Sequence, residues 1–207
     1  MIAETRGAVS LSGPIEVQMG HSVPPVKTAI DHGREPSLRV DVECNQPGDL
    51  FGQMRATFGL QRTRALLRAF ANEPMPRPLT TREVIKWAAA NGAAVNGLGA
   101  RIGPLTPGKQ ANMVPLSTDL INAMLLNNAY GAIVLGMDTS NVDTVLVGGR
   151  FVKYRRQLDG VDRQRLQQDL NGSREHVLLS AKNSLSPTAP TICNHHTPAS
   201  LARPPAP

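Results

Sequence analysis

Aromatic side chains are scarce in this sequence: Phe, Trp and Tyr make up only 3% of its 207 residues. A hydrophobic core must therefore be built mainly from Ala, Val, Leu, Ile and Met. Hydrophobic residues make up 41% of the chain, which is enough for one medium domain or two small ones. A core of this kind suits packed layers of helices and strands. The scarcity of aromatics also argues against a surface on which nucleic-acid bases stack.

Cysteines are few, and long apolar runs are missing. Cys44 and Cys193 are far apart, and neither lies in a Cys-x-x-Cys pair. No apolar run approaches the roughly 18 to 20 residues that cross a bilayer, and the start of the chain has no signal-peptide core. We therefore expect a soluble, cytoplasmic protein in a reducing setting, with no membrane partner.

Basic residues form no run, although the formal net charge is +6. Lys182 and Arg203 lie in the C-terminal tail. The other basic side chains are interspersed with all 16 acidic ones, which leaves +4 for the body of the chain. We interpret the densest group, Lys153, Arg155 and Arg156, as a solvated strand end. Nucleic acid is therefore the weakest partner class, and we expect none.

Strand and helix patterns alternate at the start of the chain. Residues 7–12 predict a buried strand, and Glu16 and Gln18, which alternate with apolar neighbours, predict the polar face of a further extended segment. Two prolines precede a predicted helix over 26–30, because proline is tolerated in a first helical turn. Residues 36–43 then predict a second strand that carries a carboxylate at its C-terminal end.

Two longer helices follow. Asp49 can cap a helix that runs to about Phe70, with apolar residues at helical spacing. Thr80 and Glu83 form a capping box for the next helix, which we expect to end at Gly92. The order strand, helix, strand, helix, helix favours a parallel α/β architecture.

The character of the sequence changes after residue 101. Gly and Pro cluster at 103–108, and residues 142–152 predict a β-hairpin. Residues 158–179 predict a helix with Leu166, Leu170 and Val177 on one side, and six prolines in 181–207 predict disorder. The expected parts are 1–101, 102–156, 157–180 and 181–207.

Three segments in this order resemble the metal-dependent amidohydrolase family, particularly the group of triazine hydrolases and purine or cytosine deaminases. The most specific is 101–114, which contains Pro107-Gly108-Lys109 before a strand. Residues 79–93 resemble the helix that leads into it, and 141–152 resemble the closing hairpin. The resemblance implies the last strands and helices of a (β/α)8 barrel plus part of a small β-sandwich, an α/β fold.

Residues 37–43 resemble the final barrel strand of that family, whose Asp binds the metal and handles protons. The resemblance therefore implies that Asp41 is both a catalytic residue and a metal ligand, for a divalent Zn or Fe ion. Such an ion lowers the pKa of bound water from about 15.7 to about 7, and a neighbouring carboxylate can take the proton and deliver it to the leaving nitrogen. Active sites of such barrels lie at the C-terminal ends of the strands. Arg39 stands where relatives carry a small residue.

The other metal ligands of the family are a His-x-His pair on the first strand and single histidines on the fifth and sixth strands. This sequence has no His-x-His pair. The resemblance places residue 1 just after the sixth strand, and so implies a truncated relative of which only the C-terminal portion is present. Met19-Gly20-His21-Ser22 resembles a turn whose histidine faces the pocket, so His21 is either a substrate-binding residue or a structural loop histidine.

Two residues depart from the family pattern in the segment after the Pro-Gly-Lys turn. Asn112 replaces an expected acidic residue. Pro115 interrupts the apolar run that follows, where it removes a ladder hydrogen bond, so we expect a frayed strand there.

The leading hypothesis is a hydrolase of non-peptide C–N bonds that acts on a small heterocyclic or amide substrate. We expect the isolated chain to be inactive, because one carboxylate cannot replace four metal ligands. The alternative is a non-catalytic binding or assembly fragment. It would associate with itself or with a missing N-terminal half through open strand edges and apolar faces.

Overall fold

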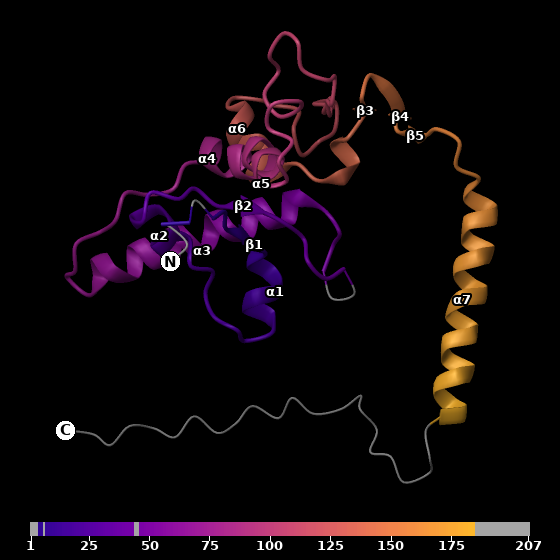
Figure 1. The fold of residues 1–207 in the computed structure, drawn as a ribbon, viewed down its shortest axis with the longest axis horizontal. Coiled ribbons are helices and arrows are strands. Elements are labelled where there is room, and N and C mark those ends of the chain that lie inside the picture. The colour runs from indigo at the N-terminus through magenta and orange to yellow at the C-terminus, as the bar shows by residue number, and fades with distance from the viewer. Residues whose placement is uncertain (1–3, 6, 44–45, 185–207) are drawn as a thin grey trace. The chain divides into compact units, whose positions relative to one another are not determined.

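The computed structural model describes residues 4–5, 7–43 and 46–184 of the 207. The chain divides into two compact units, Met1–Asp159 and Gly160–Pro207. Among the described residues, the first unit contains five short strands and all helical segments except α7, which belongs to the second (Figure 1).

Two parallel strands, β1 (Ser10–Leu11) and β2 (Ser37–Leu38), are joined through α1 (Gly13–Gln18) and α2 (Val26–Asp31). The Ser37 amide donates to the Val9 carbonyl oxygen at 2.8 Å, and the Arg39 amide donates to that of Leu11 at 3.0 Å. Both strands are shorter than predicted. Within the described residues neither has a second neighbouring strand, so the ladder extends over two residue pairs only.

The predicted extended segment with Glu16 and Gln18 on its polar face is wrong, because these residues lie on helix α1. Pro14 sits in the first turn of α1, where its missing N–H removes no hydrogen bond. The Glu16 carboxylate reaches back to accept from the Ser12 amide at 2.9 Å. A carboxylate in the first turn is also favoured by the helix dipole.

Helix α3 (Leu50–Phe70) begins and ends where the sequence predicted, and the Asp49 carboxylate caps it by accepting from the Gly52 amide at 2.9 Å. The capping box of Thr80 and Glu83 is confirmed at the start of α4 (Thr81–Lys86). The expected end at Gly92 is wrong. The helical stretch continues through a π-helical turn, η1 (Trp87–Asn91), and α5 (Gly92–Val95), and the chain turns at Gly97, whose φ is +71°.

One apolar cluster holds the first unit together. It joins both strands to α2, α3, α4, η1 and a second π-helical turn, η2 (Ala132–Gly136). The buried members are Leu11, Val26, Leu38, Met54, Leu79, Val84, Trp87 and Val134. Because α3 and the η1–α5 stretch both contact β2, the strand pair is covered by helices, as in a parallel α/β fold.

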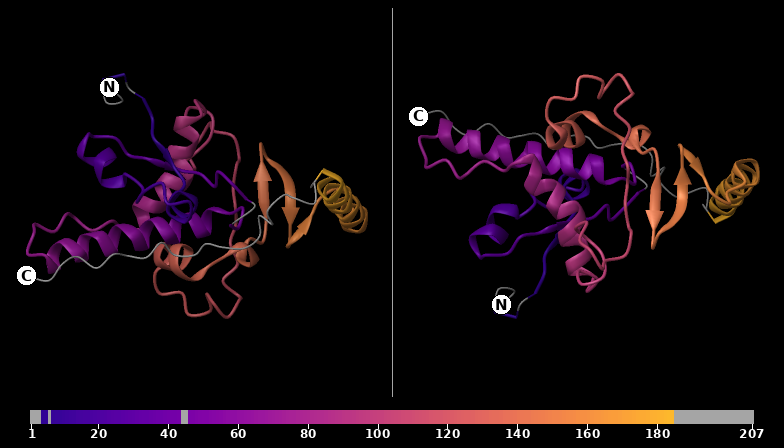
Figure 2. Two further views of the ribbon diagram at one scale, coloured as in Figure 1. Left: turned by 90° about the horizontal axis from the view of Figure 1, so that it is seen from below. Right: turned by 90° about the horizontal axis from the view of Figure 1, so that it is seen from above.

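The predicted hairpin is confirmed with a later start. β3 (Val145–Val147) pairs antiparallel with β4 (Arg150–Tyr154), and β5 (Gln157–Leu158) pairs with β4 (Figure 2). Gly148 and Gly149 form the turn with φ of +56° and +82°, the conformation that a two-residue hairpin needs. Of the basic residues predicted to form a solvated strand end, Arg155 and Arg156 lie in an exposed turn after β4, whereas Lys153 within the strand is half-buried.

The segment around Pro115 is frayed, as predicted. Its pairing is reduced to isolated bridges, Met113 with Leu146 and Leu116 with Val142. Pro115 still accepts the Asp143 amide through its carbonyl oxygen at 3.2 Å. Between this segment and β3 lie α6 (Ala129–Gly131), η2 and the 3₁₀ turn η3 (Thr139–Asn141).

The second unit contains α7 (Arg163–Ser184). The predicted start at 157 or 158 is wrong, because Leu158 belongs to β5 and Asp162 caps the helix by accepting from the amides of Gln164 and Arg165. Residues 181–184, predicted to be disordered, are helical. The rest of the predicted disordered tail lies outside the described residues.

Candidate active-site edge

Polar groups gather where the two parallel strands end. Ser12 directly follows β1, and Val40 and Asp41 follow β2. Because β1 and β2 are parallel and paired in register, their C-terminal ends meet at one edge. In (β/α)8 barrels this edge carries the active site.

Asp41 has an unusual backbone conformation. Its φ is +74°, and the Val42 amide donates to the Val40 carbonyl oxygen at 3.1 Å. A hydrogen bond between residues two apart around a residue of positive φ defines a γ-turn of the rare, strained type. The carboxylate is about one third exposed and lies 3.4 Å from Arg39, from Oδ1 to Nη1. Asp41 therefore lies at the strand edge, on a tight turn and beside Arg39.

A buried polar network lies beneath this turn. The Ser12 hydroxyl and the Gln46 side-chain amide both donate to the Val40 carbonyl oxygen, each at 2.6 Å. Gln53 on α3 joins these two donors: its Oε1 lies 3.4 Å from Ser12 Oγ, and its Nε2 donates to Gln46 Oε1 at 3.3 Å. No sequence pattern described above singled out Ser12, Gln46 or Gln53. Polar side chains on the otherwise apolar face of α3, Gln53 and Thr57, were the available signal.

His21 lies in the exposed loop between α1 and α2. Its amide donates to the Glu16 carbonyl oxygen at 3.0 Å, next to Gly20 with its φ of +68°. Among the described residues no hydrogen bond or ion pair joins His21 to Asp41. The substrate-binding role of His21 stays a prediction.

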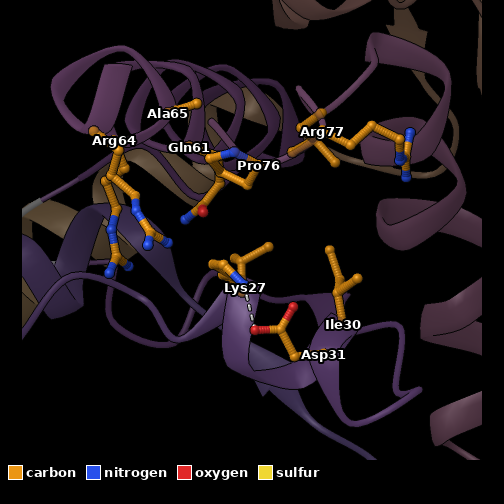
Figure 3. A pocket seen from close by; sticks show the side chains of 11 residues that line it. Lys27, Ile30, Asp31, Gln61, Arg64, Ala65, Pro76 and Arg77 are labelled. Atoms are coloured by element: carbon orange, nitrogen blue, oxygen red, sulfur yellow. Dashed lines mark hydrogen bonds and ion pairs between the residues drawn. The ribbon is translucent and has the colours of Figure 1, made fainter. Parts of the chain in front are cut away.

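A cavity of about 170 Å³ lies elsewhere, between α2, the second half of α3 and residues 76–79 (Figure 3). Lys27 pairs with Asp31 on one side of it, and Arg77 pairs with Glu83 nearby. Hydrogen bonds from Arg77 lower the pKa of Glu83 from 4.5 to about 2. Asp41 does not line this cavity, so we do not place the chemistry there.

The described residues do not fit a complete metal site. Among them, no three His, Cys, Asp or Glu side chains are grouped closely enough to hold a metal ion. The carboxylate of Asp41 pairs with Arg39, a cation that cannot ligate a metal ion. A divalent ion at this edge would need donors from outside the described part of the chain.

The family model of the amidohydrolases matches residues 16–152, about two thirds of the chain. The chain belongs to the amidohydrolase family. A 5-methylthioadenosine/S-adenosylhomocysteine deaminase of Acetivibrio thermocellus is 29% identical over 94 residues, 45% of this chain and 22% of that relative.

Two solved structures of amidohydrolase chains resemble the fold. An adenosine deaminase of Xanthomonas campestris with bound zinc has a TM-score of 0.73 at 20% identity, over 83% of this chain and 38% of its own. Atrazine chlorohydrolase of Arthrobacter aurescens with zinc has a TM-score of 0.72 at 17% identity, over 82% and 36%. These likenesses indicate a TIM-barrel-type hydrolase fold. The chain spans less than two fifths of each relative.

No helix among the described residues is both long enough and apolar enough to cross a membrane.

Proposed function

We propose that this amidohydrolase chain contributes Asp41 to the active site of a hydrolase that removes an amino group from a heterocyclic substrate. The observation that carries the proposal is the place of Asp41, just beyond the C-terminal end of a parallel strand. Family membership and the deaminase names of relatives support the reaction class. His21, in the loop after α1, is proposed to contact the substrate.

The proposed chemistry is a hydrolytic deamination. Water adds through its oxygen to the ring carbon that bears the amino group, the C–N bond then breaks, and ammonia leaves. The carboxylate of Asp41 accepts a proton from the attacking water and later delivers it to the departing nitrogen. Partial exposure leaves the carboxylate accessible to both water and substrate.

The metal of the family is expected to be Zn or Fe, but the described residues supply only one of its ligands. We therefore propose that the isolated chain is inactive and that the other donors come from another polypeptide segment. Arg39 strengthens this expectation, because its guanidinium competes with a metal cation for the same carboxylate.

Metal content and turnover test the proposal. The purified chain, incubated with zinc and gel-filtered, should retain no stoichiometric zinc and release no ammonia from adenosine. Co-expression with the N-terminal segment of an adenosine deaminase from the family should give ammonia release, which Asp41→Asn abolishes. Asp31→Asn, a change of an exposed carboxylate on α2, is the matched control and should keep the activity.

Two outcomes would overturn parts of this proposal. One zinc per chain with turnover by the chain alone would refute the ligand argument. Complemented activity that survives Asp41→Asn would refute the role of Asp41.

A non-catalytic assembly role is the second candidate. One observation in its favour is the two-stranded sheet, in which neither strand pairs with a further strand among the described residues. Another is the exposure of two apolar side chains, Ile121 at 91% and Leu125 at 96%. Light scattering after size-exclusion chromatography tests it, because a monodisperse monomer at high concentration would exclude self-association.

A further inference from the structure

We propose that Ser12, Gln46 and Gln53 are positioning residues for Asp41, and that they act by holding the carbonyl group of Val40. These three side chains are named the Val40 clamp. The inference rests on the proposed function only for the catalytic role of Asp41. The clamp itself is a property of the backbone and can be tested without any substrate.

The γ-turn at Asp41 needs an external restraint. A side chain other than glycine at a φ of +74° is strained. The internal hydrogen bond of the turn, from the Val42 amide to the Val40 oxygen, spans only one intervening residue and is a weak restraint. Such strain persists only where the surrounding structure over-determines the conformation.

The clamp supplies that restraint. Ser12 Oγ and Gln46 Nε2 reach the Val40 oxygen at 2.6 Å each, so this oxygen accepts three hydrogen bonds in all. Ser12 and Gln53 are 0% and 1% exposed, so water cannot replace the polar groups of either residue cheaply. Gln53 on α3 donates through Nε2 to Gln46 Oε1 at 3.3 Å, and its Oε1 lies 3.4 Å from Ser12 Oγ.

The clamped carbonyl belongs to the peptide group that leads directly into Asp41. Fixing this peptide plane fixes the direction in which the Asp41 side chain leaves the strand edge. A clamp formed from the residue after β1, the loop after β2 and α3 therefore ties the position of the carboxylate to three parts of the fold. A merely structural network would stabilise the unit without a specific effect on this turn.

Ser12→Ala and Gln46→Met test the clamp in the full chain. Each removes one donor to the Val40 oxygen with little change in volume. In NMR hydrogen exchange the Val42 amide should exchange roughly tenfold faster in each variant, and the Asp41 chemical shifts should move away from positive-φ values. Ser12→Thr keeps the hydroxyl and should restore both signals.

Ser37→Ala is the matched control. Ser37 is also buried, at 2% exposure, and its hydroxyl also contacts a carbonyl oxygen 28 residues away, that of Val9 at 3.4 Å, but at the start of β2. It should lower overall stability without changing the Asp41 turn relative to the rest of the unit. If Ser12→Ala and Gln46→Met change Val42 exchange no more than Ser37→Ala does, the clamp is refuted.

The two proposals fail in different measurements. The clamp substitutions could alter the Val42 and Asp41 signals while the complemented enzyme still releases ammonia in an Asp41-dependent way. That result would refute the positioning role and leave the proposed function in place. A clamp that behaves as expected in an enzyme indifferent to Asp41→Asn would refute the proposed function and leave the backbone restraint in place.

Discussion

Substitution of Asp41 should reveal the strain of its turn in the stability of the first unit. Three variants differ in how well they tolerate a φ of +74°. Asn, like Asp, is one of the residues that visit this region, glycine enters it without steric cost, and alanine has a Cβ that clashes with the backbone. We therefore expect Asp41→Ala to be the least stable of the three.

The magnitude follows from the geometry. All three variants lose the ion pair with Arg39, which at 3.4 Å between half-exposed side chains contributes at most about 1 kcal/mol. Alanine adds the steric cost of the left-handed region, about 1–2 kcal/mol. Asp41→Ala should thus lie about 1–2 kcal/mol below Asp41→Asn, while Asp41→Gly stays within about 1 kcal/mol of Asn because its gain is offset by a more flexible unfolded chain.

Urea unfolding followed by tryptophan fluorescence measures these differences. Trp87 is the sole tryptophan and is 1% exposed in the core of the first unit, so its emission reports the loss of that core. Equal midpoints for the Ala, Asn and Gly variants, with equal urea dependence, would show that the turn carries no strain. The result also decides which variant suits functional work, since Asn would remove the carboxylate charge with the least structural disturbance.

Three further changes have expected outcomes. Glu83→Gln should lower the free energy of unfolding by about 1 kcal/mol at neutral pH, less than the pKa shift alone implies because the pair with Arg77 is screened by solvent. Since the folded pKa of about 2 lies below the ordinary 4.5, this stabilisation is complete above about pH 4.5 and is lost as pH falls through 2, so urea curves of the two proteins should converge in acid. Asn112→Leu should cost about 1 kcal/mol in thermal unfolding because Asn112 Oδ1 accepts the Gly148 amide at 2.7 Å, whereas Asn112→Asp keeps an acceptor and should stay near wild type. Val134→Ala, at a side chain with 0% exposure, should cost about 2 kcal/mol by calorimetry, and a cost below 0.5 kcal/mol would contradict its place in the core.

Local signals predicted the helices and turns with good accuracy where their chemistry is self-contained. Asp49 caps α3, Thr80 and Glu83 form their capping box, and the paired glycines make the hairpin turn. Each of these features depends on contacts between residues at most four apart, so the local sequence is enough to predict it. The end of the helical stretch was missed at Gly92 because the flanking alanines favour helix strongly enough to carry it through the glycine.

The candidate site, too, was predictable from the sequence only in part. A carboxylate at the C-terminal end of a strand could be predicted from residues 36–43, although the observed strand ends at Leu38, before Asp41. The positive φ of Asp41, its contact with Arg39 and the contacts of Gln53 with Ser12 and Gln46 could not, because no local pattern fixes this turn and the Gln53 contacts depend on how α3 packs.

The sequence by itself determined most of the element types, most of the helix caps, the hairpin turn and the family, because periodicity, caps and motif order are local or collinear properties of the chain. Only the tertiary structure decided that Ser12 and Gln46 meet at the carbonyl preceding Asp41, with Gln53 beside them, and that the cavity between α2 and α3 lies away from Asp41. The reason is physical: hydrogen bonds between residues up to 41 apart form only after burial has fixed the distances and removed competing water.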